Sequence, residues 1–480
     1  MYDLIVIGED LSSHVAAAVA SHYGLNTALV AESGIGGKCL IGDFVFNIDP
    51  TPLTGFSVNQ TCFSLFAELD IPLIEQENIQ LNPAYQIILP EHRIDFFSDK
   101  ESLVKEMVRE FPELAVEINS FYDAVVKNSD IFGKWLHDHP LIQPKSIKDY
   151  YNYLKLMPYL IKYKFDIIKL KRIISRNTSF KKVMEAQQAL LSFTTNSQDS
   201  IASHFQYAAP LRGIYCFLQG KQVFFDSLIK KLESTNGLFL NNCEVLSIKK
   251  GGLVEVDVID KHGIISRISA KNLIVSTKWK GMHLLLEGKK KINMDDWVRP
   301  IKVSHYPFTI HLGIRQKCIP EKMARHLAVI SDVNKDIYDN NLIILELCMP
   351  KDEKTVSLAK NSLTATVFLP NDRVIWSDEN LAANAQSIIG RLEYFLPFLK
   401  DNIEIFDIEK SIDISKKQRD IINPKYQLRN SFISGFAAKN NKTRFGNVYL
   451  TGASLLTDAG FEGEIISGIN AVARIVGKRK

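Results

Sequence analysis

Apolar and polar residues follow one another along the first 32 positions in the order of strand, turn, helix and strand. Tyr2–Ile7 is an apolar, β-rich run, Gly8–Ser13 is a polar turn, and His14–Tyr23 is rich in small helix-forming residues. A second apolar run, Leu25–Val30, precedes Glu32. This order predicts a βαβ unit, in which the amino end of the helix lies at the carboxyl edge of two parallel strands.

The turn of this unit departs from the pattern that binds dinucleotides. In a G-x-G-x-x-G turn the backbone approaches a diphosphate at the helix N-terminus, and an acid about 20 residues later binds a ribose hydroxyl. Glu32 has the position of that acid, but only Gly8 of the three glycines is present, with Asp10 and Ser13 at the other two places. A carboxylate about 4 Å from a phosphate costs up to about 4 kcal/mol at an effective dielectric constant near 20.

Two interpretations of the turn are open. Glu9, Asp10 and Ser12 can cap the helix, because side-chain oxygens accept hydrogen bonds from its free amides and an acid complements its dipole. Alternatively, a dinucleotide binds while the Asp10 side chain is turned aside or neutralised.

Further motifs keep one order along the chain. They are Gly36–Lys38, Phe44–Thr51, Pro210–Gly213, Gly237–Val245, Asn447–Ser454 and Gly460–Ala471. In this order they resemble the phytoene-desaturase-like branch of the FAD-dependent amine-oxidase superfamily, whose GGR or GGK turn, F-D-x-G-P segment and closing strand, loop and helix approach the flavin. The sequence departs from the family pattern at Asn47, Asp49, Arg212 and Glu464.

The resemblance implies an α/β fold of two interleaved domains. The first is a discontinuous, three-layer FAD/NAD(P)-binding Rossmann-like domain formed by residues 1–95, 230–285 and 431–480. The second is an α+β substrate domain formed by a helical segment, 96–229, and a sheet segment, 286–430.

The resemblance also implies a function: an FAD-dependent oxidoreductase in which the flavin accepts hydride from a hydrophobic isoprenoid, polyene-like or amine substrate. The positions expected to bind FAD are Gly8, Ser12, Ser13, Glu32, Gly36, Gly37, Lys38, Val245, Gly452, Ala453, Gly460 and Gly463. No acid or base stands out in the sequence, so no catalytic residue is assigned.

A second hypothesis comes from a different functional class. The Rab GDP-dissociation inhibitor and escort proteins resemble flavoproteins, lack complete phosphate turns and bind prenyl lipid. By the same route this chain would be a cofactor-free protein that binds a lipid, a prenyl group or a partner. Asp10, Ser13, Asp49 and Glu464 favour this hypothesis, because they place charge or bulk where the family has small residues.

Composition restricts the remaining possibilities. The 480 residues, 46% hydrophobic and 23% charged, are typical of a folded protein of several domains. No apolar run has the ~18–20 residues of a membrane-spanning helix, and the first residues lack a positively charged leader, so we expect a cytoplasmic protein. The six cysteines show no metal-binding spacing, which predicts reduced thiols and no metal site.

The basic surplus of the chain is concentrated in Tyr151–Lys182. This stretch has nine basic residues and one acid, a net charge of +8, whereas the whole chain has +4 and the remainder therefore −4. One predicted helical face carries Tyr159, Tyr163, Ile167, Leu170 and Ile174. The stretch is interpreted either as a core-facing helix with solvated lysines or as an amphipathic helix on an anionic membrane surface, with nucleic-acid binding least favoured.

Overall fold

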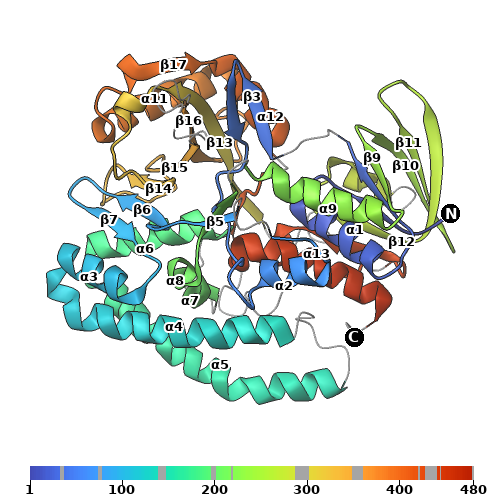
Figure 1. Ribbon diagram of the computed structural model, residues 1–480, viewed down its shortest axis with the longest axis horizontal. Coiled ribbons are helices and arrows are strands. Elements are labelled where there is room, and N and C mark those ends of the chain that lie inside the picture. The colour runs from blue at the N-terminus through green and yellow to red at the C-terminus, as the bar shows by residue number, and fades with distance from the viewer. Residues whose placement is uncertain are drawn as a thin grey trace.

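The computed structural model describes most of the chain. The described residues are 1–32, 37–73, 78–138, 147–195, 202–217, 220–286, 302–348, 361–419, 422–427, 441–443 and 445–477. Only the backbone is described for 135–138, 147–150, 152, 153, 155–157, 159, 160, 163 and 164. Two sheets with helices packed against them make up this part of the molecule (Figure 1).

The first sheet has seven strands in the order β10-β11-β12-β1-β2-β9, with β19 beside β12. Strands β1, β2, β9, β12 and β19 run parallel, and β10, β11 and β12 form an antiparallel meander. The bounds are β1 Tyr2–Ile7, β2 Thr27–Ala31, β9 Leu238–Asn241, β10 Glu244–Lys250, β11 Val254–Ile259, β12 Ile265–Ser276 and β19 Val448–Thr451. The predicted βαβ unit is therefore confirmed.

Helices cover one face of this sheet. Side chains of α1, α2, α9 and α13 form a single buried apolar cluster with Leu4, Val6 and Leu29. The opposite face packs against Trp279, Met282 and other apolar residues that follow β12. The bounds are α1 Leu11–His22, α2 Thr61–Glu68, α9 Gln222–Ser234, α13 Gly460–Val476 and the 3-10 helix η3 Lys280–Leu286.

The second sheet has eight strands in the order β17-β13-β16-β15-β14-β6-β7, with β18 beside β13. The bounds are β6 Tyr85–Ile88, β7 Arg93–Phe96, β13 Lys302–Ile314, β14 His326–Ile330, β15 Leu342–Cys348, β16 Asn361–Pro370, β17 Ile403–Phe406 and β18 Lys425–Gln427. The expected boundary at residue 95 needs correction here, because β6 pairs with β14 in parallel. Residues 85–96 thus belong to the second sheet.

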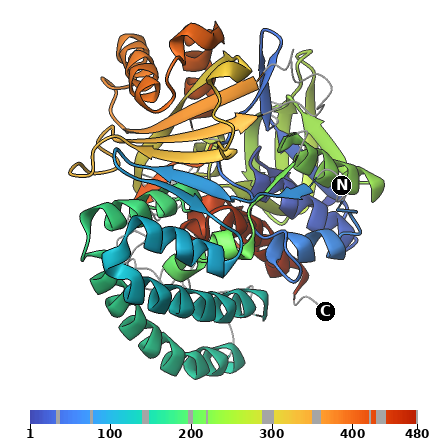
Figure 2. The same ribbon diagram turned by 60° about the vertical axis from the view of Figure 1, so that its left-hand side comes forward.

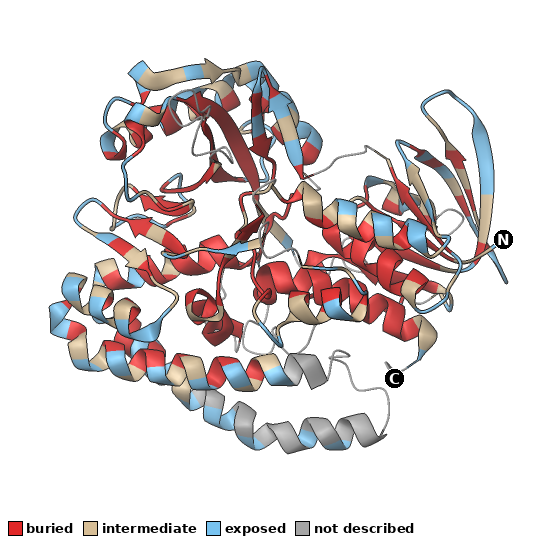
Figure 3. Cartoon of the chain, viewed as in Figure 1, coloured by how far each residue is buried: buried red, intermediate tan, exposed pale blue. Residues whose placement is uncertain are grey.

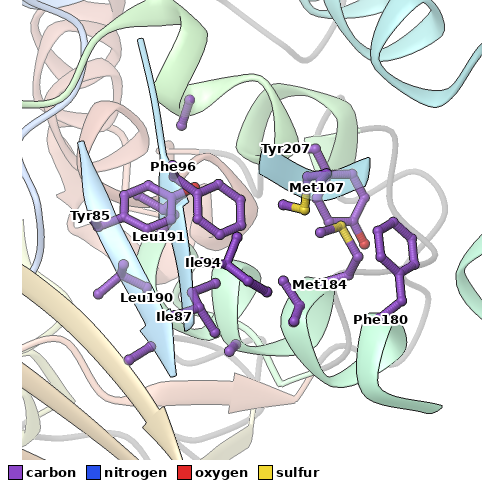
Figure 4. Packing of buried hydrophobic residues seen from close by; sticks show 14 of the residues in the cluster. Tyr85, Ile87, Ile94, Phe96, Met107, Phe180, Met184, Leu190, Leu191 and Tyr207 are labelled. Carbon is purple, nitrogen blue, oxygen red and sulfur yellow. The ribbon is translucent and has the colours of Figure 1, made fainter. Parts of the chain in front are cut away.

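Helices flank this second sheet on both sides (Figure 2). One face packs against α11 and α12, and the other against the helical segment, where Tyr85, Phe96, Met107 and Phe180 lie in one buried cluster (Figure 4). The bounds are α3 Lys100–Glu110, α4 Ala115–Asp138, α5 Ile147–Ile174, α6 Thr178–Leu191, α7 Ala202–Tyr207, α8 Ala209–Arg212, α11 Asp378–Phe395 and α12 Ile408–Gln418. Searching the described helices for a stretch long and apolar enough to cross a bilayer finds none.

Two small antiparallel sheets of two strands each complete the described strands. One is the ribbon of β3 (Lys38–Ile41) with β4 (Phe44–Asn47), and the other pairs β5 (Asn78–Gln80) with β8 (Tyr215–Phe217). The 3-10 helices are η1 Pro112–Leu114, η4 Gln316–Cys318, η6 Lys400–Asn402, η7 Ala453–Leu455 and η8 Thr457–Ala459. The most continuously buried region lies around α1 and α13, near the centre of the molecule (Figure 3).

Helix α1 and helix α13 approach each other closely at one glycine. A Cβ atom on Gly468 would lie 2.4 Å from the Ser12 carbonyl oxygen and 3.1 Å from the Val15 side chain. The small residues of α1, such as Ala16, allow this approach, and every residue of α1 except His22 is buried. The spacing of α1 and α13 therefore depends on the missing side chain at position 468.

We predict that Gly468→Ala destabilises the protein by about 1–3 kcal/mol, because the added methyl group overpacks the contact between α1 and α13. Gly390→Ala is the matched control: nothing lies within 4 Å of its Cβ position in α11, so this change should stabilise the helix by about 0.5–1 kcal/mol. The measurement is the shift in thermal unfolding midpoint. Equal shifts for the two variants would contradict the packing argument.

Candidate functional site

The turn between β1 and α1 holds a buried carboxylate. Asp10 is the N-cap of α1, and its side chain accepts hydrogen bonds from the Ser13 amide at 3.2 Å and the Ser13 hydroxyl at 2.5 Å. The hydroxyls of Ser12 and Ser276 each donate to the other carboxylate oxygen at 2.9 Å. Asp10 thus accepts four hydrogen bonds and is only 4% exposed.

The arrangement shows Asp10 as the cap of α1, as the first of the two interpretations expects. A helix N-terminus attracts anions because its first amides lack partners inside the helix and the helix dipole is positive there. The Asp10 carboxylate occupies this position, together with the Ser12 and Ser13 hydroxyls that were expected to face a phosphate. The protein therefore supplies its own anion at the place where the diphosphate of a dinucleotide would bind.

A cavity of about 620 Å³ opens on one side of Asp10. It lies at the carboxyl ends of β1, β2 and β12, which is where ligands bind in parallel sheets. Its lining residues are Gly8, Glu9, Asp10, Glu32, Glu244, Val245, Leu246, Ser276, Lys278, Trp279, Lys280, Gly281, His283, Leu284 and Lys417. The volume falls within the range of about 300–1,000 Å³ of small-molecule pockets.

Three of the expected cofactor positions meet in this cavity. Gly8, Glu32 and Val245 all line it, although they are far apart in sequence. The Val245 amide donates a hydrogen bond to the Glu32 carboxylate at 3.0 Å, which ties the ends of β2 and β10 together. The acid expected to hold a ribose is therefore positioned by a backbone amide of β10.

On the other side of Asp10 the site contains a buried ion pair. The Lys278 ammonium lies 3.3 Å from the Glu464 carboxylate, and both side chains are about 5% exposed or less. The Asn423 side-chain amide donates to the second oxygen of Glu464 at 2.9 Å. Burial raises the pKa of Glu464, and Asp10 adds to this, whereas Lys278 and the Asn423 hydrogen bond oppose it.

A second lysine fills the neighbouring space. Lys221 donates hydrogen bonds to the backbone carbonyls of Asp49 and Thr51, and its ammonium lies 3.8 Å from the Asp49 carboxylate. Burial works to raise the pKa of Asp49, but Lys221 and the Thr51 hydrogen bonds outweigh it, and the net pKa is lowered.

The described residues leave little room on this side. Asp10, Asp49, Lys221, Lys278 and Glu464 line a space of about 60 Å³. Such a space holds a few water molecules. By contrast, ligand pockets reach about 300 Å³ or more.

These observations test whether FAD fits the residues that are present. The adenosine half has a cavity of suitable size, but the diphosphate position holds the Asp10 carboxylate, and charged side chains fill the space beyond it. A diphosphate would have to displace or neutralise Asp10 beside a second acid, Glu464. As the side chains stand, the site does not fit FAD.

The other expected cofactor positions do not line this cavity, and one of them lies outside the described residues. Gly36 lies outside the described residues. The Gly37 amide donates to the Gln222 side chain at 2.5 Å, and Lys38 is exposed on the β3–β4 ribbon. Gly460 and Gly463 are packing positions, since added Cβ atoms would lie 1.9 Å from the Leu191 carbonyl oxygen and 2.2 Å from the Leu456 carbonyl oxygen.

The two expected cofactor positions that follow the closing strand, β19, are also tightly packed. Gly452 has φ of 136°, and a Cβ there would lie 2.2 Å from the Thr277 hydroxyl. Ala453 is buried in a small cluster with Phe193 and Tyr426. Gly452 and Ala453 are therefore tightly packed against neighbouring segments.

Sequence reasoning missed Ser276, Lys278 and Lys221. Ser276 ends β12, and Lys278 follows it by two residues, so both lie at the carboxyl edge of a parallel strand. That position was the available signal, because such edges carry binding residues. Lys221 carried no comparable signal, since it precedes α9 and reaches Asp49 only through the tertiary fold.

Another departure from the family pattern, Arg212, makes a buried contact near this site. Arg212 lies 2.9 Å from the Glu462 carboxylate, which is fully buried and also accepts a hydrogen bond from Thr61 at 2.8 Å. The Arg212 guanidinium stacks 3.5 Å from the centre of the Phe205 ring. The arginine that replaces a family glycine therefore joins the helical segment to α13.

A third buried lysine borders the site from the second sheet. Lys425 donates to the carbonyls of Ala189 and Ser192 and lies 4.6 Å from the centre of the Phe368 ring. Burial lowers its pKa to about 7, and the nearby Asp49 opposes this.

Comparison with known proteins shows the fold. A variant of putrescine oxidase with redesigned cofactor binding superposes with a TM-score of 0.59 at 13% identity, covering 100% of this chain and 99% of that one. An oxidoreductase from Methanosarcina mazei gives 0.54 at 13% identity, covering 99% and 100% of the chains. A Rab GDI from Plasmodium falciparum gives 0.55 at 12% identity, covering 100% and 99%.

No family model and no curated protein matches the sequence. The structural likeness confirms the predicted fold class, an FAD-binding, Rossmann-like flavoprotein fold with a second domain. The neighbours include proteins described as oxidoreductases and one Rab GDI, so the fold alone does not choose between the two functional hypotheses. The phytoene-desaturase branch stays a prediction.

We predict that Lys278→Met destabilises the protein by about 3–5 kcal/mol, because it leaves the Glu464 carboxylate buried without its cation. The double variant Lys278→Met/Glu464→Gln should recover most of this loss. Lys100→Met, which breaks an exposed ion pair with Asp123, is the matched control and should cost less than about 1 kcal/mol. Chemical unfolding measures all three.

The stability of Lys278→Met against unfolding should depend on pH in a defined direction. Because the pKa of Glu464 is raised in the folded protein, stability is lost as the pH rises above the carboxyl's unfolded value. Removing Lys278 should steepen that loss. A single variant as stable as the double variant at neutral pH would contradict the assignment of this ion pair.

We predict the opposite slope for Lys425. Its pKa of about 7 in the folded protein lies below the value of about 10.4 in the unfolded chain. The unfolded state therefore binds more protons between these values, and stability rises with pH there. Wild type should gain up to about 1.4 kcal/mol per pH unit relative to Lys425→Met. A flat or falling difference in unfolding midpoint above pH 7 would overturn this prediction.

Proposed function

We propose that this chain is a ligand-binding protein that keeps the flavoprotein fold and works without a flavin. The observation that carries the proposal is the Asp10 carboxylate, which takes the helix N-terminal amide and three hydroxyls that a diphosphate would need. The buried pair Lys278–Glu464 and the Lys221 side chain support it, because they lie in the space beyond the diphosphate position. The likeness in fold to a Rab GDI agrees with such a role.

The ligand would bind in the cavity of about 620 Å³. Glu32 offers a carboxylate for hydroxyl groups, Trp279 offers an aromatic wall, and Val245 and Leu246 offer apolar contacts. Asp10 and Glu9 repel an anionic group beside the amino end of α1, although Lys278, Lys280 and Lys417 also line the cavity. The acids beside α1 favour an uncharged ligand of nucleoside size, with hydroxyl groups and a flat ring, over a nucleotide diphosphate.

A second candidate function is the FAD-dependent oxidoreductase that the sequence resemblance implies. One observation favours it: Gly8, Glu32 and Val245 still line an open cavity at the adenosine half of the expected site. It requires Asp10 to turn away from its four hydrogen-bond donors and Lys221 to leave Asp49. The hydrophobic substrate expected from the resemblance belongs to this candidate.

We predict that the purified full-length chain is colourless and takes up no FAD, and that adenosine binds at least about tenfold more tightly than ADP. The physical reason is repulsion between the Asp10 carboxylate and a diphosphate, which costs up to about 4 kcal/mol. Asp10→Asn should keep the cap but strengthen ADP binding, with adenosine binding unchanged. Absorbance spectroscopy and titration calorimetry measure these effects.

Glu244→Gln is the matched control, because it removes a carboxylate from the cavity wall at the other strand and should not change the preference between adenosine and ADP. Copurified flavin, or FAD binding that Asp10→Gly strengthens, would reject the flavin-free function and support the oxidoreductase. Equal affinity for adenosine and ADP in the wild type would show that Asp10 does not face the phosphate position.

A further inference from the structure

Helix α5 carries a stripe of exposed apolar side chains on its outer side. Its members are Tyr151, Leu154, Ile161, Phe165 and Ile168, each between 40% and 68% exposed. Together with the exposed Pro158 they follow one another at spacings of three, four, three, four and three residues. That spacing places all of them on one face of the helix.

The opposite face of α5 belongs to the core. Ile167, Leu170, Ile173 and Ile174 are buried, and the last three belong to the cluster that also holds Phe121 and Phe180. The face expected from the sequence is confirmed as core-facing for Ile167, Leu170 and Ile174, whereas the side chains of Tyr159 and Tyr163 lie outside the described residues. The helix therefore has two apolar faces, and the interior accounts for only one of them.

The stripe occupies an accessible position. α5 runs along the outer edge of the helical segment, beyond α4 and far from the first sheet, in both views of the ribbon (Figures 1 and 2). Exposed apolar side chains in a row are uncommon on a protein that stays in water, and such rows mark contact surfaces.

Basic residues border the stripe on both sides. Lys162 and Lys169 lie on one side by helical spacing, Lys171 lies on the other, and Arg172 continues the stripe toward its end. All four are exposed. Asp166, the only acid of the basic stretch, is half-buried beside Asn128, whose side-chain amide donates to it at 3.3 Å. The surface of α5 is therefore both apolar and positively charged.

We infer that the α5 stripe docks the protein on the surface of an anionic lipid bilayer. The apolar side chains would enter the boundary between headgroups and acyl chains, and the flanking lysines and arginines would contact anionic headgroups. Of the nine basic residues in 151–182, Arg176, Lys181 and Lys182 pair with Glu117 and Glu185. The outward charge therefore comes from exposed residues of α5 such as Lys162, Lys169 and Arg172, and it orients this edge toward a negative surface. A second copy of the chain would present the same positive charge to this face, which opposes self-association through it.

The inference goes beyond the proposed function and does not depend on the identity of the ligand in the cavity. The stripe lies on the helical segment of the second domain, whereas the cavity lies at the edge of the first sheet. A failure of membrane docking would therefore leave the proposed ligand binding intact, and the reverse also holds.

Vesicle flotation of the full-length protein tests the inference. We expect binding to vesicles of phosphatidylcholine with phosphatidylserine, at least about tenfold weaker binding to phosphatidylcholine alone, and loss of binding at high salt. Leu154→Ser/Phe165→Ser and, separately, Lys162→Glu/Arg172→Glu should each reduce binding at least about tenfold. All four side chains are exposed, so the variants should keep the wild-type circular dichroism spectrum and unfolding midpoint.

The matched control is Val374→Ser/Tyr394→Ser, which removes two apolar side chains that are each 71% exposed but lie in or near α11. It should bind vesicles as the wild type does. Equal loss in the control and stripe variants, or no binding to anionic vesicles, overturns the inference. The inference is also overturned if a stripe variant floats with vesicles as the wild type does but no longer forms a dimer or no longer binds a nucleic-acid probe. A second copy of the chain or a nucleic acid, and not a membrane, would then cover the stripe.

Discussion

The hydrogen bonding of the Asp10 carboxylate is the constraint on which the centre of this molecule depends. It caps α1, joins α1 to the end of β12 through Ser276, and holds the Ser12 and Ser13 hydroxyls inward. A buried carboxylate is costly unless its oxygens are hydrogen-bonded, and here four donors and the helix dipole satisfy it. One side chain therefore does for the fold what a bound diphosphate does in a dinucleotide-binding protein.

Further charged side chains lie next to Asp10. Glu464, Lys278, Asp49 and Lys221 lie beyond it, and their positive and negative groups alternate through the space between the two sheets. On the other side of Asp10, by contrast, Glu32 and Val245 are joined by a hydrogen bond and line an open cavity. The space beyond Asp10 is thus small and lined by charged side chains, whereas the space beside Glu32 is a cavity of about 620 Å³.

Sequence patterns predict the backbone here better than they predict the chemistry. The βαβ unit and the closing strand follow from periodicity and from motif order, because burial of one face of a strand or helix imposes that periodicity. The glycines of the last segment resemble cofactor contacts, yet Gly460 and Gly463 are required by neighbouring carbonyls. The partners of Lys221 and Lys278 are set by tertiary packing between segments far apart in sequence, which no local pattern contains.

The interleaving of the first sheet has a consequence for how the chain reaches its native state. β1 pairs with β12 and β2, β19 is added from the far end, and α13 packs along α1. The part of α1 that meets α13 consequently stays uncovered until residues 460–476 have folded against it. Contacts of such long sequence separation slow folding and expose apolar surface in the meantime. Helix α1 and β1 are therefore protected only when segments more than 200 residues away along the chain have folded against them.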